Sequence, residues 1–120
     1  MTIKIKAKTF TALALGASLL AAGPAAEAAK TPKKTVKIGD NFFSPKTMSV
    51  KAGTLVTWKW LPDNADSHDV KLKKGPKGVK KFTSEIAATD YSYKKKLSTK
   101  GSYSLYCTLH EDMSQKITVK

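Results

Sequence analysis

Four side chains in the C-terminal half of the sequence have the chemistry of metal ligands. Cys107, His110 and Met113 are spaced three residues apart, and His68 lies 39 residues upstream of Cys107. A thiolate, two imidazoles and a thioether together suit copper better than most other metals. Cys107 is the only cysteine, so it cannot form an internal disulfide, and metal ligation is an alternative to an intermolecular bond or a free reactive thiol.

Zinc is the main competitor for such a site. It binds Cys and His, and a carboxylate of Asp69, Glu111 or Asp112 could supply an oxygen ligand. Zinc rarely takes a thioether, and structural zinc sites usually carry more than one Cys. The donor set therefore favours copper and leaves zinc open.

The segments that must position these side chains alternate apolar and polar residues over short runs. Such runs, rich in β-branched and aromatic residues and separated by turn residues, predict β-strands. Turns at spacings of about 8–12 residues predict an all-β fold of seven or eight strands, an antiparallel sandwich or barrel. The predicted strands cover 36–38, 47–51, 55–60, 68–72, 82–86, 91–97, 103–107 and 114–119. The predicted core includes the aromatic residues Phe42, Phe43, Trp58, Trp60, Tyr103 and Tyr106.

The connection 108–112 joins the last two predicted strands. A tight loop there would turn Cys107, His110 and Met113 toward one point, and His68 would arrive from a neighbouring strand or loop. The four candidate ligands would then meet at one end of the sandwich.

The N-terminus has the organisation of a secretory signal peptide, predicted to be residues 1–28. Three lysines precede an apolar run, 10–22, that is too short to span a bilayer comfortably, and Ala26-Glu27-Ala28 offers a cleavage site. The sequence thus predicts a short basic lead-in, 29–35, a domain, 36–120, and a periplasmic or secreted protein without a transmembrane anchor after processing. An uncleaved membrane anchor is the alternative.

The chain is strongly basic through lysine alone. It has 22 Lys, no Arg and 9 acidic residues, for a net charge of +13. Such a surface attracts anionic partners, here a redox protein with an acidic surface or an anionic cell envelope, and it favours a monomer. Export and the lack of Arg argue against a nucleic-acid partner, because Arg is preferred for phosphate and base contacts.

The run from Gly101 to His110, Gly-Ser-Tyr-Ser-Leu-Tyr-Cys-Thr-Leu-His, resembles the Gly-x-Tyr-x-Tyr-x-Cys-x-x-His signature of cupredoxins of the plastocyanin and amicyanin type. The segments 56–58 and 68–70 resemble the family's first-histidine region, and Cys-x-x-His-x-x-Met resembles the short ligand loop of amicyanin. The resemblance covers 36–119 and implies an all-β, antiparallel Greek-key β-sandwich of seven or eight strands. It implies one type 1 copper ion, with the ligands His68, Cys107, His110 and Met113.

The same resemblance implies a blue-copper carrier that moves one electron between redox proteins and is not an enzyme. It also implies that the edge of His110 is the electron exit. Two alternatives stay open: a copper-binding module for storage, delivery or resistance, and a metal-free structural or adhesion domain.

Three residues depart from the family pattern. Asp69 stands where the family often has Asn, and Leu109 and Glu111 stand where amicyanins have Pro. We expect Asp69 to tie the two ligand segments together by hydrogen bonding toward Thr108, and its charge to lower the reduction potential.

Overall fold

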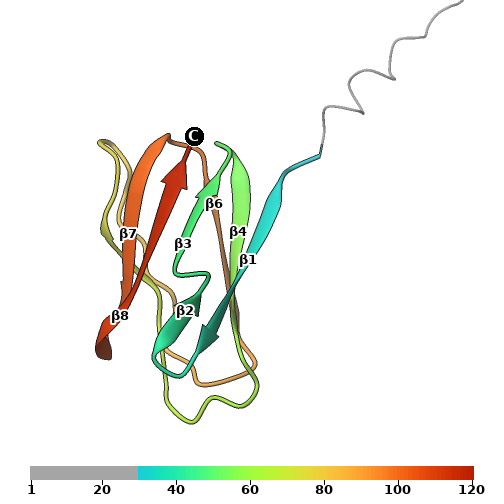
Figure 1. Cartoon of the computed structure of the whole chain (residues 1–120), viewed down its shortest axis with the longest axis vertical. Helices are drawn as coiled ribbons and strands as arrows, with labels where there is room; N and C mark the ends of the chain where they lie inside the picture. The colour runs from blue at the N-terminus through green and yellow to red at the C-terminus, as the bar shows by residue number, and fades with distance from the viewer. Residues whose placement is uncertain (1–29) are drawn as a thin grey trace, which may run out of the picture. The chain divides into compact units, whose positions relative to one another are not determined.

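The computed structural model describes residues 30–120, which form two four-stranded β-sheets (Figure 1). The predicted signal peptide, 1–28, lies outside the described residues. Among the described residues, no helix has the length and apolar character needed to cross a membrane. The strands are β1 (Lys33–Gly39), β2 (Phe42–Ser44), β3 (Thr47–Val50), β4 (Thr54–Trp60), β5 (Lys71–Lys74), β6 (Ser92–Leu97), β7 (Gly101–Cys107) and β8 (His110–Val119).

Each sheet combines strands that are distant in the sequence. One sheet has the order β2-β1-β4-β6, and the other has the order β3-β8-β7-β5. Most neighbours are antiparallel, but β1 pairs with β4 and β3 pairs with β8 in parallel. The predicted all-β sandwich is confirmed, with eight strands and one parallel pairing in each sheet.

The core lies between the sheets and follows from the period-two alternation of side chains along each strand. In β4, Val56, Trp58 and Trp60 are buried, while Lys59 is exposed. The indole N–H of Trp58 donates to Oε1 of buried Gln115 on the opposite sheet, at 2.9 Å. This bond gives the buried indole N–H an acceptor, which a large buried Trp side chain usually needs.

Several details of the predicted strands were wrong. The run 82–86 forms no strand and contributes only an isolated bridge between Thr83 and Lys71. Phe42 opens a short strand and is 45% exposed, so it is not in the core, whereas its neighbour Phe43 is buried. Tyr106 is only half buried, because alternation along β7 turns it to the outer face of its sheet.

The register brings the ends of several strands together at one end of the sandwich, the lower end in Figure 1. β1 and β4 run parallel and finish there at Gly39 and Trp60. β7 also finishes there, at Cys107, and pairs with the start of β8. The connections after β1, β4 and β7 therefore meet at this end, which we call the metal end.

Candidate metal centre

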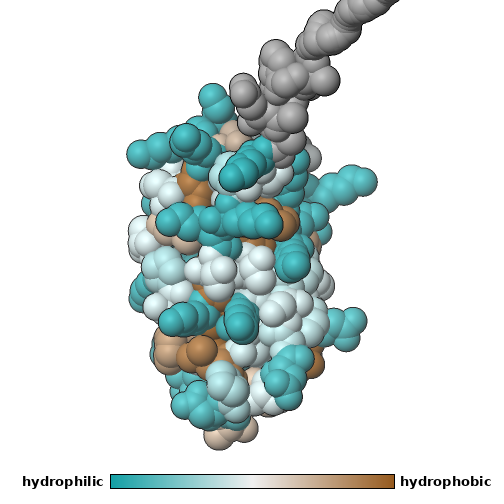
Figure 2. All heavy atoms as spheres, turned by 90° about the vertical axis from the view of Figure 1, so that its right-hand side faces the viewer, coloured by the Kyte–Doolittle hydropathy of each residue, from teal (hydrophilic) through white to brown (hydrophobic). Residues whose placement is uncertain are grey.

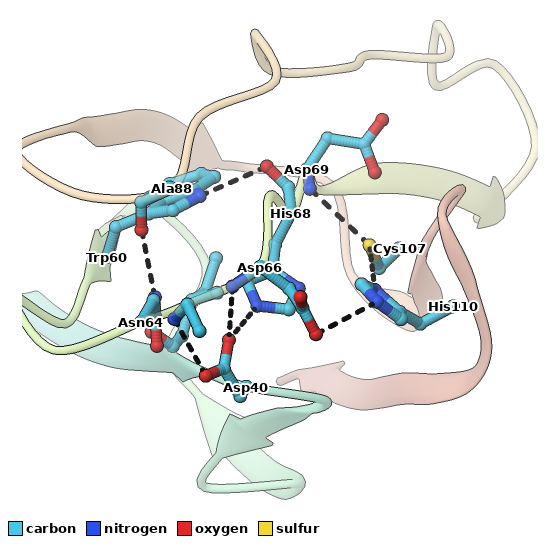
Figure 3. A network of polar contacts seen from close by, with 11 residues as sticks. Asp40, Trp60, Asn64, Asp66, His68, Asp69, Ala88, Cys107 and His110 are labelled. Carbon is cyan, nitrogen blue, oxygen red and sulfur yellow. Dashed lines mark hydrogen bonds and ion pairs between the residues drawn. The ribbon is translucent and has the colours of Figure 1, made fainter.

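Three of the four predicted ligands converge at the metal end. One ligand atom from each of His68, Cys107 and His110 lies within 4.8 Å of the others. Figure 3 shows the two imidazoles and the thiol arriving from separate segments, the β4–β5 connection and the β7–β8 hairpin. Such a group of a thiol and two imidazoles is a metal-binding donor set.

His68 is fully buried, and its two ring nitrogens have different surroundings. Its Nε2 lies 2.9 Å from Oδ1 of Asp40. Its Nδ1 is buried without any hydrogen-bond partner among the described residues. A buried polar atom without a partner is costly, and metal-binding histidines commonly donate their second nitrogen to a carboxylate. His68 therefore fits a metal ligand that binds through Nδ1.

Asp40, which follows β1, holds the His68 ring in this orientation. Its carboxylate also accepts hydrogen bonds from the backbone N–H groups of Ala65, at 2.9 Å, and Asp66, at 3.1 Å. The Ala65 N–H, then His68 and then the Asp66 N–H lower the pKa of Asp40 to about 2. A charged acceptor at Nε2 keeps the proton on that nitrogen and leaves Nδ1 free to bind a metal.

Sequence reasoning did not identify Asp40, which lies 28 residues before His68. The only local signal is its place in the tight β1–β2 turn, where the next residue, Asn41, has a positive φ of 71°. That signal predicts a turn and says nothing about which side chain lies beside it.

Cys107 ends β7 and is fully buried. Burial raises the pKa of its thiol, because a thiolate loses solvation in the interior. The backbone N–H of Asp69 lies 3.5 Å from Sγ, and Nδ1 of His110 lies 3.6 Å from it. A bound metal cation would replace the thiol proton and supply the positive charge that this environment lacks.

The predicted contact between Asp69 and Thr108 is present. One carboxylate oxygen accepts the Thr108 backbone N–H at 2.7 Å, and the other accepts its hydroxyl at 2.6 Å. These two bonds join the segment that carries His68 to the hairpin that carries Cys107 and His110. Because both oxygens of Asp69 are engaged, this carboxylate is poorly suited to be the oxygen ligand of a zinc site.

Met113 lies on β8 and is 1% exposed. It lines a small pocket of about 290 Å³ together with Asn41, His110, Glu111 and Asp112. Its side chain is thus next to the His110 segment, on the inner face of the sandwich. Its role as the axial ligand remains a prediction.

His110 is the most exposed of the three residues in this group. Its side chain is 27% exposed, whereas that of His68 is fully buried. Its Nδ1 faces Cys107, and its Nε2 lies 3.9 Å from a carboxylate oxygen of Asp66 (Figure 3). One edge of the His110 ring therefore connects the buried group to the surface.

Comparison with known sequences agrees with this arrangement. A family described as copper binding proteins, plastocyanin/azurin family, matches residues 30–120. Amicyanin-alpha of Methylorubrum extorquens is 33% identical over 107 residues, which cover 89% of this chain and 86% of the relative. Amicyanin of Paracoccus versutus is 31% identical over 96 residues, which cover 78% of this chain and 70% of the relative.

Solved structures show the same fold. The reduced Cu(I) form of an amicyanin mutant matches with a TM-score of 0.64 and 27% identity, over 80% of this chain and 89% of that chain. A copper-containing nitrite reductase from Thermus scotoductus matches with a TM-score of 0.63 and 24% identity, over 74% of this chain and only 22% of the enzyme. The second likeness shows the fold alone.

Proposed function

Because the chain belongs to the plastocyanin/azurin family of copper-binding proteins, as a cupredoxin of the amicyanin type, we propose that it is a small exported electron carrier. It holds one type 1 copper ion, which supplies a one-electron redox couple when bound. The proposed ligands are His68 and His110 through Nδ1, Cys107 through Sγ, and Met113 as the weak axial ligand. Its partners are redox proteins that donate and accept the electron.

The observation that carries this proposal is the free Nδ1 of His68. It is fully buried, has no partner among the described residues, and belongs to the group formed with Cys107 and His110. A metal-free structural domain would leave this polar atom uncompensated, which costs about 1–3 kcal/mol. A metal ion held by this donor set of one thiol and two imidazoles would be the missing partner of Nδ1.

The surrounding residues support a centre that changes little between oxidation states. Asp40 fixes the ring of His68, and the Asp69–Thr108 bonds fix the hairpin relative to that ring. Burial of Cys107 and Met113 excludes water from two of the proposed ligands. Rigid ligands in a dry site favour electron transfer, and the exposed edge of His110 is the proposed exit.

The same features favour a carrier over a delivery module. Copper delivery requires ligands that release the ion readily, whereas three of the proposed ligands are 0–1% exposed. We also propose that the chain is not an enzyme, because its sequence relatives over most of its length are amicyanins and its likeness to a nitrite reductase covers only 22% of that enzyme.

Export and surface binding form a further part of the proposal. The N-terminal lysines, apolar run and Ala-x-Ala site support cleavage after Ala28 and a periplasmic or secreted location. Lysines on the outer strand faces, such as Lys37 and Lys59, support contact with an anionic cell envelope. Figure 2 shows hydrophilic side chains spread over one such face, with only small separate hydrophobic areas, which supports a monomer.

The test is a visible spectrum of the mature domain, 29–120, titrated with Cu(II). An intense blue thiolate-to-copper band should appear at one equivalent and be absent in Cys107→Ser. Met113→Leu should keep a blue band but shift the reduction potential. A weak band, or one that survives in Cys107→Ser, would overturn the proposal, and rapid loss of copper to a mild chelator would favour the delivery module.

A further inference from the structure

We infer that the surface around His110 docks a positively charged redox partner, although the protein as a whole is strongly positive. The inference rests on the proposed function as an electron carrier and specifies the chemistry of the partner at the electron exit. The net charge of the whole chain, taken alone, predicted an acidic partner. The inference here rests instead on where the charges lie.

The lysines of the described residues avoid the metal end. Lys4, Lys6 and Lys8 lie outside these residues, which leaves 19 of the 22 lysines. None of these falls in the segments 38–45, 60–70, 82–93 and 101–115. These segments include the β1–β2, β4–β5 and β7–β8 connections, which meet at the metal end. The lysines lie instead along the strands and at the opposite end, for example at Lys51, Lys100 and Lys120.

The carboxylates have the opposite distribution. After Glu27 the sequence has eight acidic residues, and the structure describes all of them. Seven lie in connections at the metal end or next to a strand end there, and Glu85 is the exception. These seven are Asp40, Asp63, Asp66, Asp69, Asp90, Glu111 and Asp112. The molecule therefore has a negative end and a positive remainder.

The negative groups surround the proposed electron exit. A carboxylate oxygen of Asp66 lies 3.9 Å from Nε2 of His110. Glu111 and Asp112 are exposed and line the same pocket as His110. Leu109, on the other side of His110, is 48% exposed and offers an apolar contact at the centre of this surface.

An independent observation places the redox centre at this end. His68 is fully buried, its Nδ1 has no partner among the described residues, and it forms with Cys107 and His110 a group that fits a metal ion. A partner that exchanges an electron must therefore contact the acidic end, where the edge of His110 is exposed.

Electrostatics then selects the sign of a productive partner. An anionic protein is attracted to the lysine-bearing faces, where its cofactor stays far from His110. A cationic surface is repelled from those faces and guided to the acidic end, because charge complementarity steers encounter and fixes orientation. The fitting partner is a redox protein whose cofactor edge is surrounded by lysine or arginine.

The test compares two oxidants of opposite charge acting on the reduced, copper-loaded protein. Tris(phenanthroline)cobalt(III) is a trivalent cation and ferricyanide is a trivalent anion, and each takes one electron from the protein, which reduces Co(III) to Co(II) or Fe(III) to Fe(II). Raising the ionic strength from about 10 to about 200 mM should slow the cobalt reaction roughly fivefold or more and accelerate the ferricyanide reaction.

Matched variants locate the effect. Glu111→Gln combined with Asp112→Asn and Ser98→Lys combined with Thr99→Lys raise the net charge equally, the first pair at the exit and the second at the exposed β6–β7 turn at the opposite end. The first pair should slow the cobalt reaction about fivefold at low salt, and the second should change it less than about twofold. The reduction potential of each variant is measured as well, so that a rate change caused by driving force is separated from one caused by encounter.

Two outcomes are distinguishable. If ferricyanide reacts faster at low salt than at high salt, or if both variant pairs have the same effect, net charge governs the encounter and this inference is overturned. If the protein has no blue band, or if neither oxidant takes an electron from it, the proposed function itself fails.

Discussion

Asp69 is the residue whose charge should most directly set the reduction potential. It is 4% exposed, its backbone N–H lies 3.5 Å from Sγ of Cys107, and its carboxylate accepts two hydrogen bonds from Thr108. The oxidised centre is more positive by one charge than the reduced centre. A nearby carboxylate therefore stabilises the oxidised form, and Asp69→Asn should raise the potential.

The magnitude follows from Coulomb's law. At an assumed separation of about 8 Å and an effective dielectric constant of about 20, a unit charge contributes about 2 kcal/mol. For a one-electron couple this energy corresponds to about 90 mV, since about 59 mV equals a tenfold change in equilibrium constant. Asn at position 69 can still accept the Thr108 N–H, so the connection between the two segments should survive the substitution.

The assay is voltammetry of the copper-loaded protein at neutral pH, with the blue band as a check that the centre is intact. Ser98→Lys, which changes the net charge by the same amount at the opposite end, should shift the potential by less than about 20 mV, because salt screens distant exposed charges. Thr108→Val removes the hydroxyl bond and keeps the charge. A potential unchanged in Asp69→Asn, or an equal rise in Thr108→Val, would refute the electrostatic explanation.

Three further substitutions test the support of the site and fold. Asp40→Ala should weaken copper binding about 10- to 100-fold in a competition titration, because the His68 ring loses its orienting partner, whereas exposed Asp63→Ala should not. Gln115→Leu should lower the free energy of unfolding in urea by about 2–4 kcal/mol, since it leaves a buried indole N–H and a carbonyl without partners. Gly101→Ala should cost about 1–3 kcal/mol in the same assay, because φ is 138° and a Cβ would lie 2.7 Å from Pro76.

Unfolding curves that match the parent protein would contradict the second and third of these expectations. Exposed Ser114→Ala, next to Gln115, is the control for the second. Equal copper affinities for the Asp40 and Asp63 variants would contradict the first.

The sequence alone determined the strand architecture and the local half of the site. Alternation and β-branched or aromatic content are local properties, so they predicted the strands of an all-β fold, with Trp58 and Trp60 in its core. Cys107, His110 and Met113 belong to one hairpin, and a hairpin brings together residues that are already close in the chain. The weak point was 82–86, a mostly polar segment that was predicted as a strand and forms only an isolated bridge from Thr83 to Lys71.

Only the tertiary structure decided how the distant residues meet. Asp40 reaches His68 because β1 and β4 lie parallel and end side by side, a pairing between segments that no local pattern predicts. The same register gathers the carboxylates at one end and leaves the lysines elsewhere. Net charge is a sum over composition, whereas the field that a partner meets depends on which strand ends the fold brings together.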